Sequence, residues 1–275
     1  MEVLDHKIKI VFSDIDGTLI GKDKCLSKAT IAQLKRIKTD IPVVLITSRM
    51  PSAVTHLQEA AGISNFPLVC YNGGLITCQG KVIAETSIPY SIVEALILAN
   101  NKISQSCHMS LYRSNDWYVP TMDYWAKREI HNTKTTPKVA TNLEVLEKWK
   151  PLQNGAHKIM CMGSSKAIDA ILAYATTHFS EQLNCYRSKD TYLEIASKKV
   201  SKKTAVKVVL DTFYSEIPTD AVVAFGDNYN DAEMLSYVGI GVAMENAKPE
   251  IKAVSNYITS SSDKDGVALF LEQHT

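Results

Sequence analysis

Ile8-Lys-Ile-Val-Phe-Ser13 runs directly into Asp14-Ile-Asp16-Gly17-Thr18, so a short, mostly apolar run ends on two carboxylates. Runs of this kind predict buried strands of a parallel sheet that is covered on both faces. Three more runs also end on polar residues: Pro42-Val-Val-Leu-Ile46 before Thr47-Ser48-Arg49, Pro67-Leu-Val-Cys-Tyr71 before Asn72-Gly73-Gly74, and Val222-Val-Ala-Phe225 before Gly226-Asp227-Asn-Tyr-Asn230-Asp231. Since ligands bind beyond the carboxyl ends of such strands, we expect these segments to meet at one site.

Helical segments alternate with these strands. Ser27 precedes an apolar stripe that reaches Ile37, and a second helix is expected from Pro51 to Ala61, closed by Gly62. Such βαβ units wind into a parallel sheet. The fold class is therefore α/β, with a Rossmann-like parallel-sheet core.

The alternation of strand and helix segments stops at about Lys81. All three tryptophans (Trp117, Trp125 and Trp149) lie between that residue and Ser188. A strand pair, a further strand and a long helix predict an inserted α+β cap domain there. We expect the core in residues 1–84 and 189–275 and the cap in residues 85–188. The core would resume with a strand at Tyr192-Leu-Glu-Ile195 and a helix from Ser201.

Composition narrows the class of protein. The chain has 275 residues, 45% of them hydrophobic, and 30 basic against 29 acidic residues, a net charge of +1. This balance favours neither a nucleic-acid partner nor a membrane partner. No signal peptide or membrane-length apolar run is evident, and the six cysteines form no C-x-x-C pair, so a cytoplasmic location is expected.

The acidic residues at the strand ends suggest a cation site. Asp14 and Asp16 are two residues apart, so both can face one ligand, and Asp227 and Asp231 follow another strand. A calcium loop of the EF-hand type is excluded, because its twelfth position, normally Glu, falls on Cys25. Four clustered carboxylates would repel one another, and Mg²⁺ is the usual counter-ion beside phosphate.

Two further residues suit phosphate chemistry, and each has an ordinary structural explanation. Lys202 lies at the start of a helix, where free N–H groups bind anions, but spacing alone does not choose it among Lys198, Lys199 and Lys203. Thr47 offers a hydroxyl at a strand end, although a turn or cap is the commoner use. No Walker A motif and no G-x-G-x-x-G after a strand is present.

Together these motifs resemble those of the haloacid dehalogenase superfamily of phosphatases. Further segments resemble the Cof-type branch with a class IIB cap: Asn72-Gly73-Gly74, Val200-Ser201-Lys202-x-Thr204-Ala205, Gly241-Val-Ala-Met244-x-Asn246-Ala247 through Lys252, and Asp265-Gly266-Val267. The resemblance spans nearly the whole chain. Ser48, Lys203 and Glu245 depart from it, since each stands where the family commonly has Gly.

The resemblance implies roles for individual residues. Asp14 would be the nucleophile and Asp16 the general acid and base. Mg²⁺ would be held by Asp14, the Asp16 backbone carbonyl and Asp227. Asp231 is also expected among the metal-site residues, where it would orient Lys202 or a metal-bound water. Residues expected to bind the phosphoryl group or the substrate are Thr47, Ser48, Lys202, Asn72, Gly73 and Asn230 in the core, and Arg113 and Lys158 in the cap. Trp117 and Trp125 are weaker candidates, since aromatic side chains more often form a small domain's own core.

The expected activity is therefore magnesium-dependent hydrolysis of small phosphate esters, sugar phosphates first among them, by a monomer or small homo-oligomer. Two alternatives stay open. A phosphotransferase or mutase would pass the phosphoryl group from Asp14 to a second alcohol. A phospho-accepting module similar to a receiver domain would keep the phosphoryl group without turnover, although the inserted domain argues against it.

Overall fold

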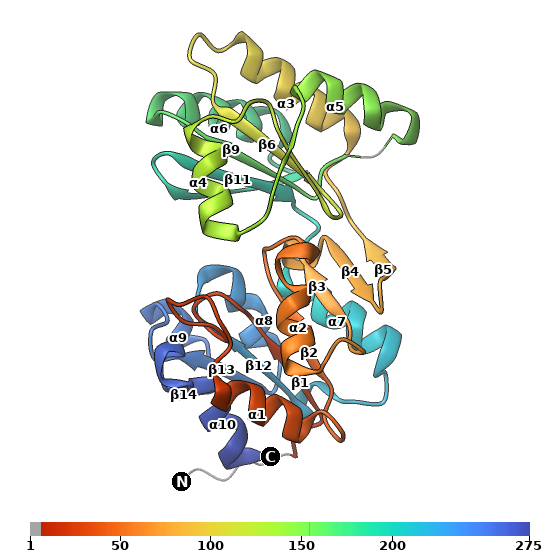
Figure 1. Ribbon diagram of the computed structural model, residues 1–275, viewed down its shortest axis with the longest axis vertical. Helices are drawn as coiled ribbons and strands as arrows, with labels where there is room; N and C mark the ends of the chain where they lie inside the picture. Colours follow the sequence, from red (N-terminus) through yellow and green to blue (C-terminus); the bar gives the residue numbers. More distant parts are fainter. Residues whose placement is uncertain (1–6, 154) are drawn as a thin grey trace. The chain divides into compact units, whose positions relative to one another are not determined.

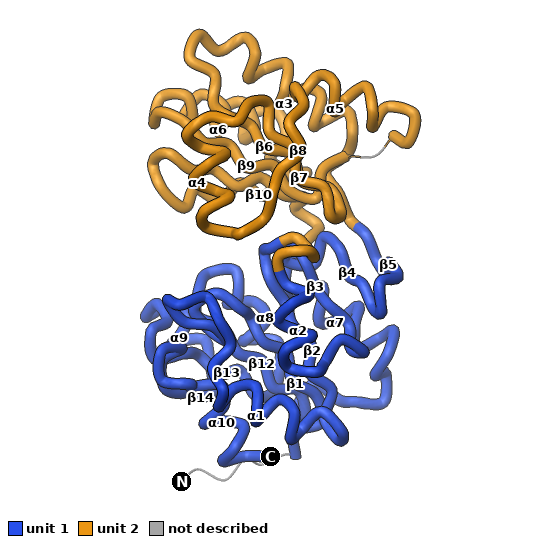
Figure 2. The backbone as a smooth tube through the Cα atoms, viewed as in Figure 1, with its two compact units in different colours: residues 1–49, 54–85, 201–275 blue, residues 50–53, 86–200 orange. Residues whose placement is uncertain are grey.

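The computed structural model describes residues 7–153 and 155–275, which divide into two compact units (Figures 1 and 2). Unit 1 contains residues up to 49 together with 54–85 and 201–275, and unit 2 contains residues 50–53 and 86–200. The expected core and cap boundaries differ from this division in three places. Residues 50–53 and residues 189–200 group with unit 2, and Glu85 groups with unit 1.

Unit 1 is built on an eight-stranded sheet, as far as residues 7–153 and 155–275 define it, in the order β14-β13-β12-β1-β2-β3-β4-β5. The strands from β14 to β3 are parallel, and β4 and β5 add an antiparallel hairpin. Their bounds are β1 (Ile10–Ser13), β2 (Val43–Ile46), β3 (Leu68–Cys70), β4 (Leu75–Cys78), β5 (Lys81–Glu85), β12 (Val222–Gly226), β13 (Ile240–Met244) and β14 (Tyr257–Thr259).

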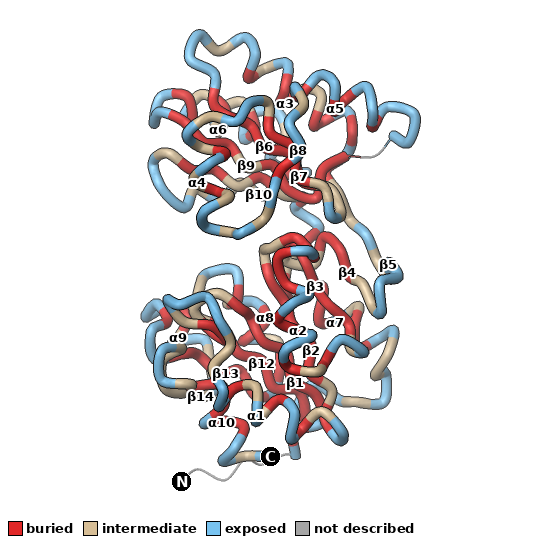
Figure 3. Tube along the Cα trace, viewed as in Figure 1, coloured by how far each residue is buried: buried red, intermediate tan, exposed pale blue. Residues whose placement is uncertain are grey.

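The four apolar runs found in the sequence are β1, β2, β3 and β12, and all four are buried (Figure 3). From β1 the chain builds the sheet first toward β2 and β3 and later toward β12, β13 and β14. β1 therefore lies where the strand order reverses, which is the position at which open α/β sheets bind ligands.

Helices cover both faces of this sheet (Figure 1). One face packs against α7 (Lys202–Phe213), α8 (Ala232–Tyr237) and α9 (Pro249–Ala253). The other packs against α1 (Lys28–Ile37), α2 (Thr55–Ala61) and α10 (Gly266–His274), whose Phe270 meets Phe225 of β12 edge to face at 5.4 Å. The Ser27 hydroxyl caps α1 and Gly62 ends α2 with φ +65°, as predicted, while the expected first turn of α2 is a separate 3₁₀ turn, Pro51–Ala53.

Unit 2 contains a six-stranded sheet within its described residues, in the order β10-β11-β9-β6-β7-β8. Its strands are β6 (His108–Arg113), β7 (Asp116–Val119), β8 (Lys138–Val139), β9 (Lys158–Met162), β10 (Leu183–Lys189) and β11 (Tyr192–Ser197). One face packs against α3 (Tyr90–Lys102), α5 (Asn142–Trp149) and α6 (Ser165–Phe179). Near the other face of the sheet lies α4 (Tyr124–Thr133), whose Trp125 ring packs 5.6 Å, centre to centre, from the Tyr192 ring of β11.

The strand expected at residues 192–195 forms, but its assignment to the core is wrong. It is β11, which pairs antiparallel with β10 and β9 of unit 2. Leu193 and Ile195 pack into the core of unit 2, so one face of this strand meets the helices of the inserted unit. Among the described residues, no α-helix is both long enough and apolar enough to span a membrane.

Candidate active site

Asp14 lies directly after the central strand β1, and its carboxylate is almost fully buried. The chain turns immediately beyond it, with Gly17 at φ +81°. This position requires glycine for a second reason, since a Cβ atom there would lie 2.5 Å from Oδ2 of Asp227. The turn therefore brings the segment after β1 against the segment after β12.

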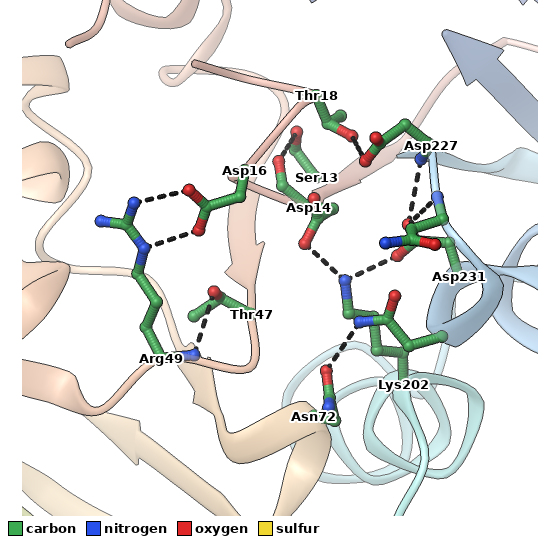
Figure 4. Close-up of polar contacts among 12 residues, drawn as sticks. Ser13, Asp14, Asp16, Thr18, Thr47, Arg49, Asn72, Lys202, Asp227 and Asp231 are labelled. Atoms are coloured by element: carbon green, nitrogen blue, oxygen red, sulfur yellow. Dashed lines mark hydrogen bonds and ion pairs between the residues drawn. The ribbon is translucent and has the colours of Figure 1, made fainter. Parts of the chain in front are cut away.

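Lys202 joins Asp14 to the acidic loop after β12. Its side chain is completely buried at the first turn of α7, and Nζ donates to Oδ1 of Asp14 at 2.5 Å and to Oδ1 of Asp231 at 2.6 Å (Figure 4). Burial alone would lower the pKa of Lys202, but the two carboxylates raise it above its ordinary value. Lys202 is thus a fixed cation, and geometry distinguishes it from its basic neighbours.

Asp231 organises the loop that carries Asp227. Its Oδ2 accepts hydrogen bonds from the backbone N–H groups of Asp227 and Asn228, each at 3.0 Å. Gly226 is required beside it, because a Cβ atom there would lie 2.4 Å from Cβ of Asp231. Both oxygens of Asp231 are therefore already engaged, which favours the orienting role over direct metal binding.

The carboxylates of Asp14, Asp227 and Asp231 form an acidic cluster in which Asp14 and Asp231 are buried and Asp227 is half-buried. One oxygen atom from each lies within 4.8 Å of the other two. Burial and the neighbouring carboxylates raise the pKa of Asp14 to about 7 and that of Asp227 to about 6, although Lys202 opposes both shifts. One ammonium cannot neutralise three carboxylates, so a divalent cation with oxygen ligands fits this donor set.

The Asp16 side chain does not join this cluster. Its carboxylate points toward Arg49, which donates from Nε to Oδ2 and from Nη2 to Oδ1, both at 2.6 Å (Figure 4). Lys24 adds a third bond to Oδ1 at 2.9 Å. Burial would raise the pKa of Asp16, but the two cations hold it below its ordinary value. The sequence did not predict that Arg49 pairs with Asp16, although Arg49 belongs to the predicted strand-end segment Thr47-Ser48-Arg49.

The expected phosphate-binding residues of unit 1 gather at the same edge of the sheet. Thr47 is buried at the end of β2, where its hydroxyl accepts the Arg49 N–H at 3.2 Å, and Ser48 follows it. Asn72, at φ +56°, accepts a hydrogen bond from the Asn230 side chain at 3.0 Å, so the loops after β3 and β12 meet.

Gly73 packs the loop after β3 against the start of α7. A Cβ atom at this position would lie 2.9 Å from Cβ of Ala205 and 3.0 Å from the carbonyl oxygen of Ser201. Its φ of +109° also excludes most other residues. The position thus explains why glycine stands there, while its contact with a substrate stays a prediction.

The cap candidates lie in unit 2 and have partners there. Arg113 donates from Nη1 to the Gly155 carbonyl at 2.8 Å. The ammonium of Lys158 lies 4.9 Å from the centre of the Tyr112 ring and 3.8 Å from the Glu194 carboxylate. Substrate contacts of Arg113 and Lys158 stay predictions.

The two tryptophan candidates pack against other aromatic side chains. Trp117 stacks on the Tyr112 ring at 5.6 Å, and Trp125 packs between Tyr124 and Tyr192.

Lys203 and Glu245, which depart from the family pattern, have ordinary partners. The ammonium of Lys203 lies 5.7 Å from the centre of the Tyr237 ring. Glu245 accepts a hydrogen bond from Lys264 at 3.3 Å. Neither substitution removes one of the groups that form the carboxylate cluster.

Comparison with known proteins agrees with this geometry. Residues 11–271 match the family model of haloacid dehalogenase-like hydrolases. A Haemophilus influenzae protein provisionally named a phosphatase is 32% identical over 270 residues, which cover 96% of this chain and 97% of the relative. The chain belongs to the haloacid dehalogenase-like hydrolases, and it is an enzyme of their phosphatase class.

A second relative and two solved structures extend the comparison. The 5-amino-6-(5-phospho-D-ribitylamino)uracil phosphatase YitU of Bacillus subtilis is 26% identical and covers 98% of this chain and 99% of its own length. A haloacid dehalogenase-like hydrolase from Bacteroides thetaiotaomicron shares the fold, with a TM-score of 0.87, 24% identity and coverage of 97% and 99%. The subclass IIB sugar phosphatase BT4131 does so with a TM-score of 0.79, 20% identity and coverage of 96% and 98%.

Proposed function

We propose that this chain is a Mg²⁺-dependent phosphomonoester hydrolase that acts on small phosphorylated metabolites through an aspartyl-phosphate on Asp14. The observation that carries this proposal is the buried Asp14 carboxylate at the switch point of the sheet, bonded to the fixed cation Lys202. A carboxylate in this position is a suitable nucleophile, because an adjacent cation can bind the phosphoryl oxygens as charge moves onto them.

The residues divide the reaction into two steps. An oxygen of Asp14 attacks phosphorus, the bond between phosphorus and the ester oxygen breaks, and Asp16 donates a proton to the leaving alcohol. In the second step Asp16 accepts a proton from water, whose oxygen attacks phosphorus. The bond to Asp14 then breaks, which releases inorganic phosphate and restores the carboxylate. Lys202 and Thr47 bind phosphoryl oxygens in both steps.

Asp14, the backbone carbonyl of Asp16 and Asp227 would hold the cation. When bound, Mg²⁺ supplies positive charge beside the phosphoryl oxygens and relieves the repulsion among the buried carboxylates. Asp231 acts on Lys202 and on the backbone of the loop after β12, since its oxygens already accept hydrogen bonds there.

We infer that sugar phosphates and related polyol phosphates are the first substrates to test. The resemblance to the phosphatase YitU, whose named substrate carries a phosphorylated ribityl chain, supports this class, as does the fold shared with a sugar phosphatase. The cap residues Arg113 and Lys158 are the proposed contacts to the leaving group, and they are the positions at which specificity would change.

Phosphate release from a panel of phosphorylated sugars, polyols and the ribitylaminouracil phosphate, with Mg²⁺ or with a chelator, tests the proposal. Asp14→Asn should abolish release, while Asp40→Asn, an exposed aspartate outside the cluster, should behave as the unaltered chain. Transfer of the phosphoryl group to an added alcohol without phosphate release would indicate a phosphotransferase. A phosphoryl group that stays on the protein without turnover would indicate a phospho-accepting module.

A further inference from the structure

Asn246 connects three loops at the carboxyl edge of the unit 1 sheet. It follows β13, and its Nδ2 donates to the Gly17 carbonyl at 2.8 Å. Its Oδ1 accepts the backbone N–H of Ser262, in the loop after β14, at 2.9 Å. Nδ2 also lies 3.5 Å from Oδ2 of Asp227, a long hydrogen bond. One side chain thus bonds to the loops that follow β1, β12 and β14.

Two of these contacts act on groups that we assign to the cation. Asp227 is held from two sides, because Oδ1 accepts from the Thr18 hydroxyl at 3.1 Å and Oδ2 faces Asn246. The bond to the Gly17 carbonyl fixes the peptide next to that of Asp16. An amide can orient a carboxylate without neutralising it, whereas a lysine would compete with a divalent cation for the same charge.

We propose that Asn246 is a positioning residue for the divalent cation, which sets the arrangement of Asp227 and of the turn after Asp14 without contacting the ion. The inference rests on the proposed function, since it requires that this cluster binds Mg²⁺. Outer partners of metal ligands are known to change metal affinity by about 10- to 100-fold when they are removed. We expect an effect of that size from the loss of the Asn246 amide.

Asn256 is a matched control, because its side chain bonds to the opposite end of β13. Its Oδ1 accepts the backbone N–H of Gly241, near the start of β13, at 2.8 Å. Both asparagines therefore connect β13 to neighbouring loops, and loss of either should cost similar stability. Only Asn246 lies beside Asp227. A purely structural role would predict the same behaviour for Asn246→Ala and Asn256→Ala.

The experiment is a calorimetric titration of Mg²⁺ into the substrate-free full chain. Asn246→Ala should weaken Mg²⁺ binding by about 10-fold or more, while Asn256→Ala should leave the affinity unchanged. Asn246→Leu keeps the approximate size of the side chain, adds no charge and cannot donate to the Gly17 carbonyl, so it should also weaken binding, and it serves if the alanine variant does not fold. Asp227→Asn should remove binding and so identifies the site.

Two results would overturn the inference. Unchanged affinity in Asn246→Ala, with binding lost in Asp227→Asn, would refute the role of Asn246 and leave the proposed function intact. Absence of Mg²⁺ binding by the unaltered chain would overturn both the inference and the proposed metal dependence.

Discussion

The Arg49 guanidinium holds the Asp16 carboxylate through two hydrogen bonds, Nε to Oδ2 and Nη2 to Oδ1, each of 2.6 Å. This paired geometry fixes the orientation of the carboxylate and favours its charged form. Asp16 therefore points away from Asp14 in this state (Figure 4). To protonate a leaving group, as we propose, it must leave Arg49 and take up a proton, whereas the later role as a base suits the charged form.

Replacing Arg49 by Met should raise the pKa of Asp16, because burial then acts with only Lys24 to oppose it. Carbon-detected NMR titration of the aspartate carboxyls measures this directly. A depressed pKa contributes stability that is present above the unfolded value of about 3.9 and is lost as pH falls through the folded value. Acid unfolding of Arg49→Met should thus begin at higher pH. Arg36→Met, a change on α1, is the control, and an unchanged pKa of Asp16 in Arg49→Met would contradict the pairing.

Asp16→Asn should affect substrates according to their leaving groups. A nitrophenolate leaves without protonation, so phosphorylation of Asp14 by 4-nitrophenyl phosphate should stay close to normal. Phosphorylation by a sugar phosphate should slow by about 10²- to 10⁴-fold, the usual contribution of general acid catalysis. Rapid-quench measurement of the first turnover separates this step from hydrolysis. Equal losses with both esters would exclude Asp16 as the acid.

Lys202→Met should destabilise the chain strongly in the absence of divalent cations. The substitution leaves the buried carboxylates of Asp14 and Asp231 without their cation, and breaking a buried pair in this way costs about 3–5 kcal/mol. The loss should shrink at low pH, because the Asp14 carboxylate, whose pKa is raised, then takes up a proton. Denaturant unfolding at two pH values tests this. Lys203→Met, next in the chain, should change stability by about 0.5 kcal/mol or less, and an equally small effect at Lys202 would contradict the account.

Binding of Mg²⁺ should release protons near neutral pH. The folded pKa values of Asp14, about 7, and Asp227, about 6, lie above their ordinary range. A raised carboxylate pKa stabilises the folded state at low pH, and this contribution is lost as pH rises through the folded value. The metal-free chain should therefore lose stability as the pH rises from about 4 to about 7, and Mg²⁺ affinity should increase as the pH rises toward about 7. Calorimetry in buffers of different ionisation enthalpy counts the protons released, and a pH-independent affinity would argue against these shifts.

The apolar runs predict β1, β2, β3 and β12 because strands buried on both faces leave a continuous hydrophobic signal. The expectation that their ends converge follows from the common edge of a parallel sheet. Tyr192-Leu-Glu-Ile195 lacks that signal, since a glutamate interrupts the run and only Leu193 and Ile195 enter the apolar core of unit 2. This alternation is typical of an antiparallel strand with one covered face, and it points to the inserted unit.

The sequence alone does not determine which side chains from distant segments pair with one another. Arg49 follows a motif threonine, and nothing in its spacing selects Asp16 as its partner. Asn246 lies within a quoted motif, but its contacts with Gly17 and Ser262 depend on the order of β1, β13 and β14 in the sheet. Family resemblance selects Lys202 among four lysines, and only the burial between two carboxylates explains that choice physically.

The most direct test of the central claim is to locate the phosphoryl group on the protein. Asp16→Asn should accept phosphate from 4-nitrophenyl phosphate and release it slowly, so the intermediate accumulates and can be trapped by acid quench. Peptide mass spectrometry should then find the phosphoryl group on Asp14, and Asp14→Asn in the same background should carry none. A phosphoryl group on another residue, or rapid phosphate release with no labelled protein at any time point, would contradict an aspartyl-phosphate mechanism on Asp14.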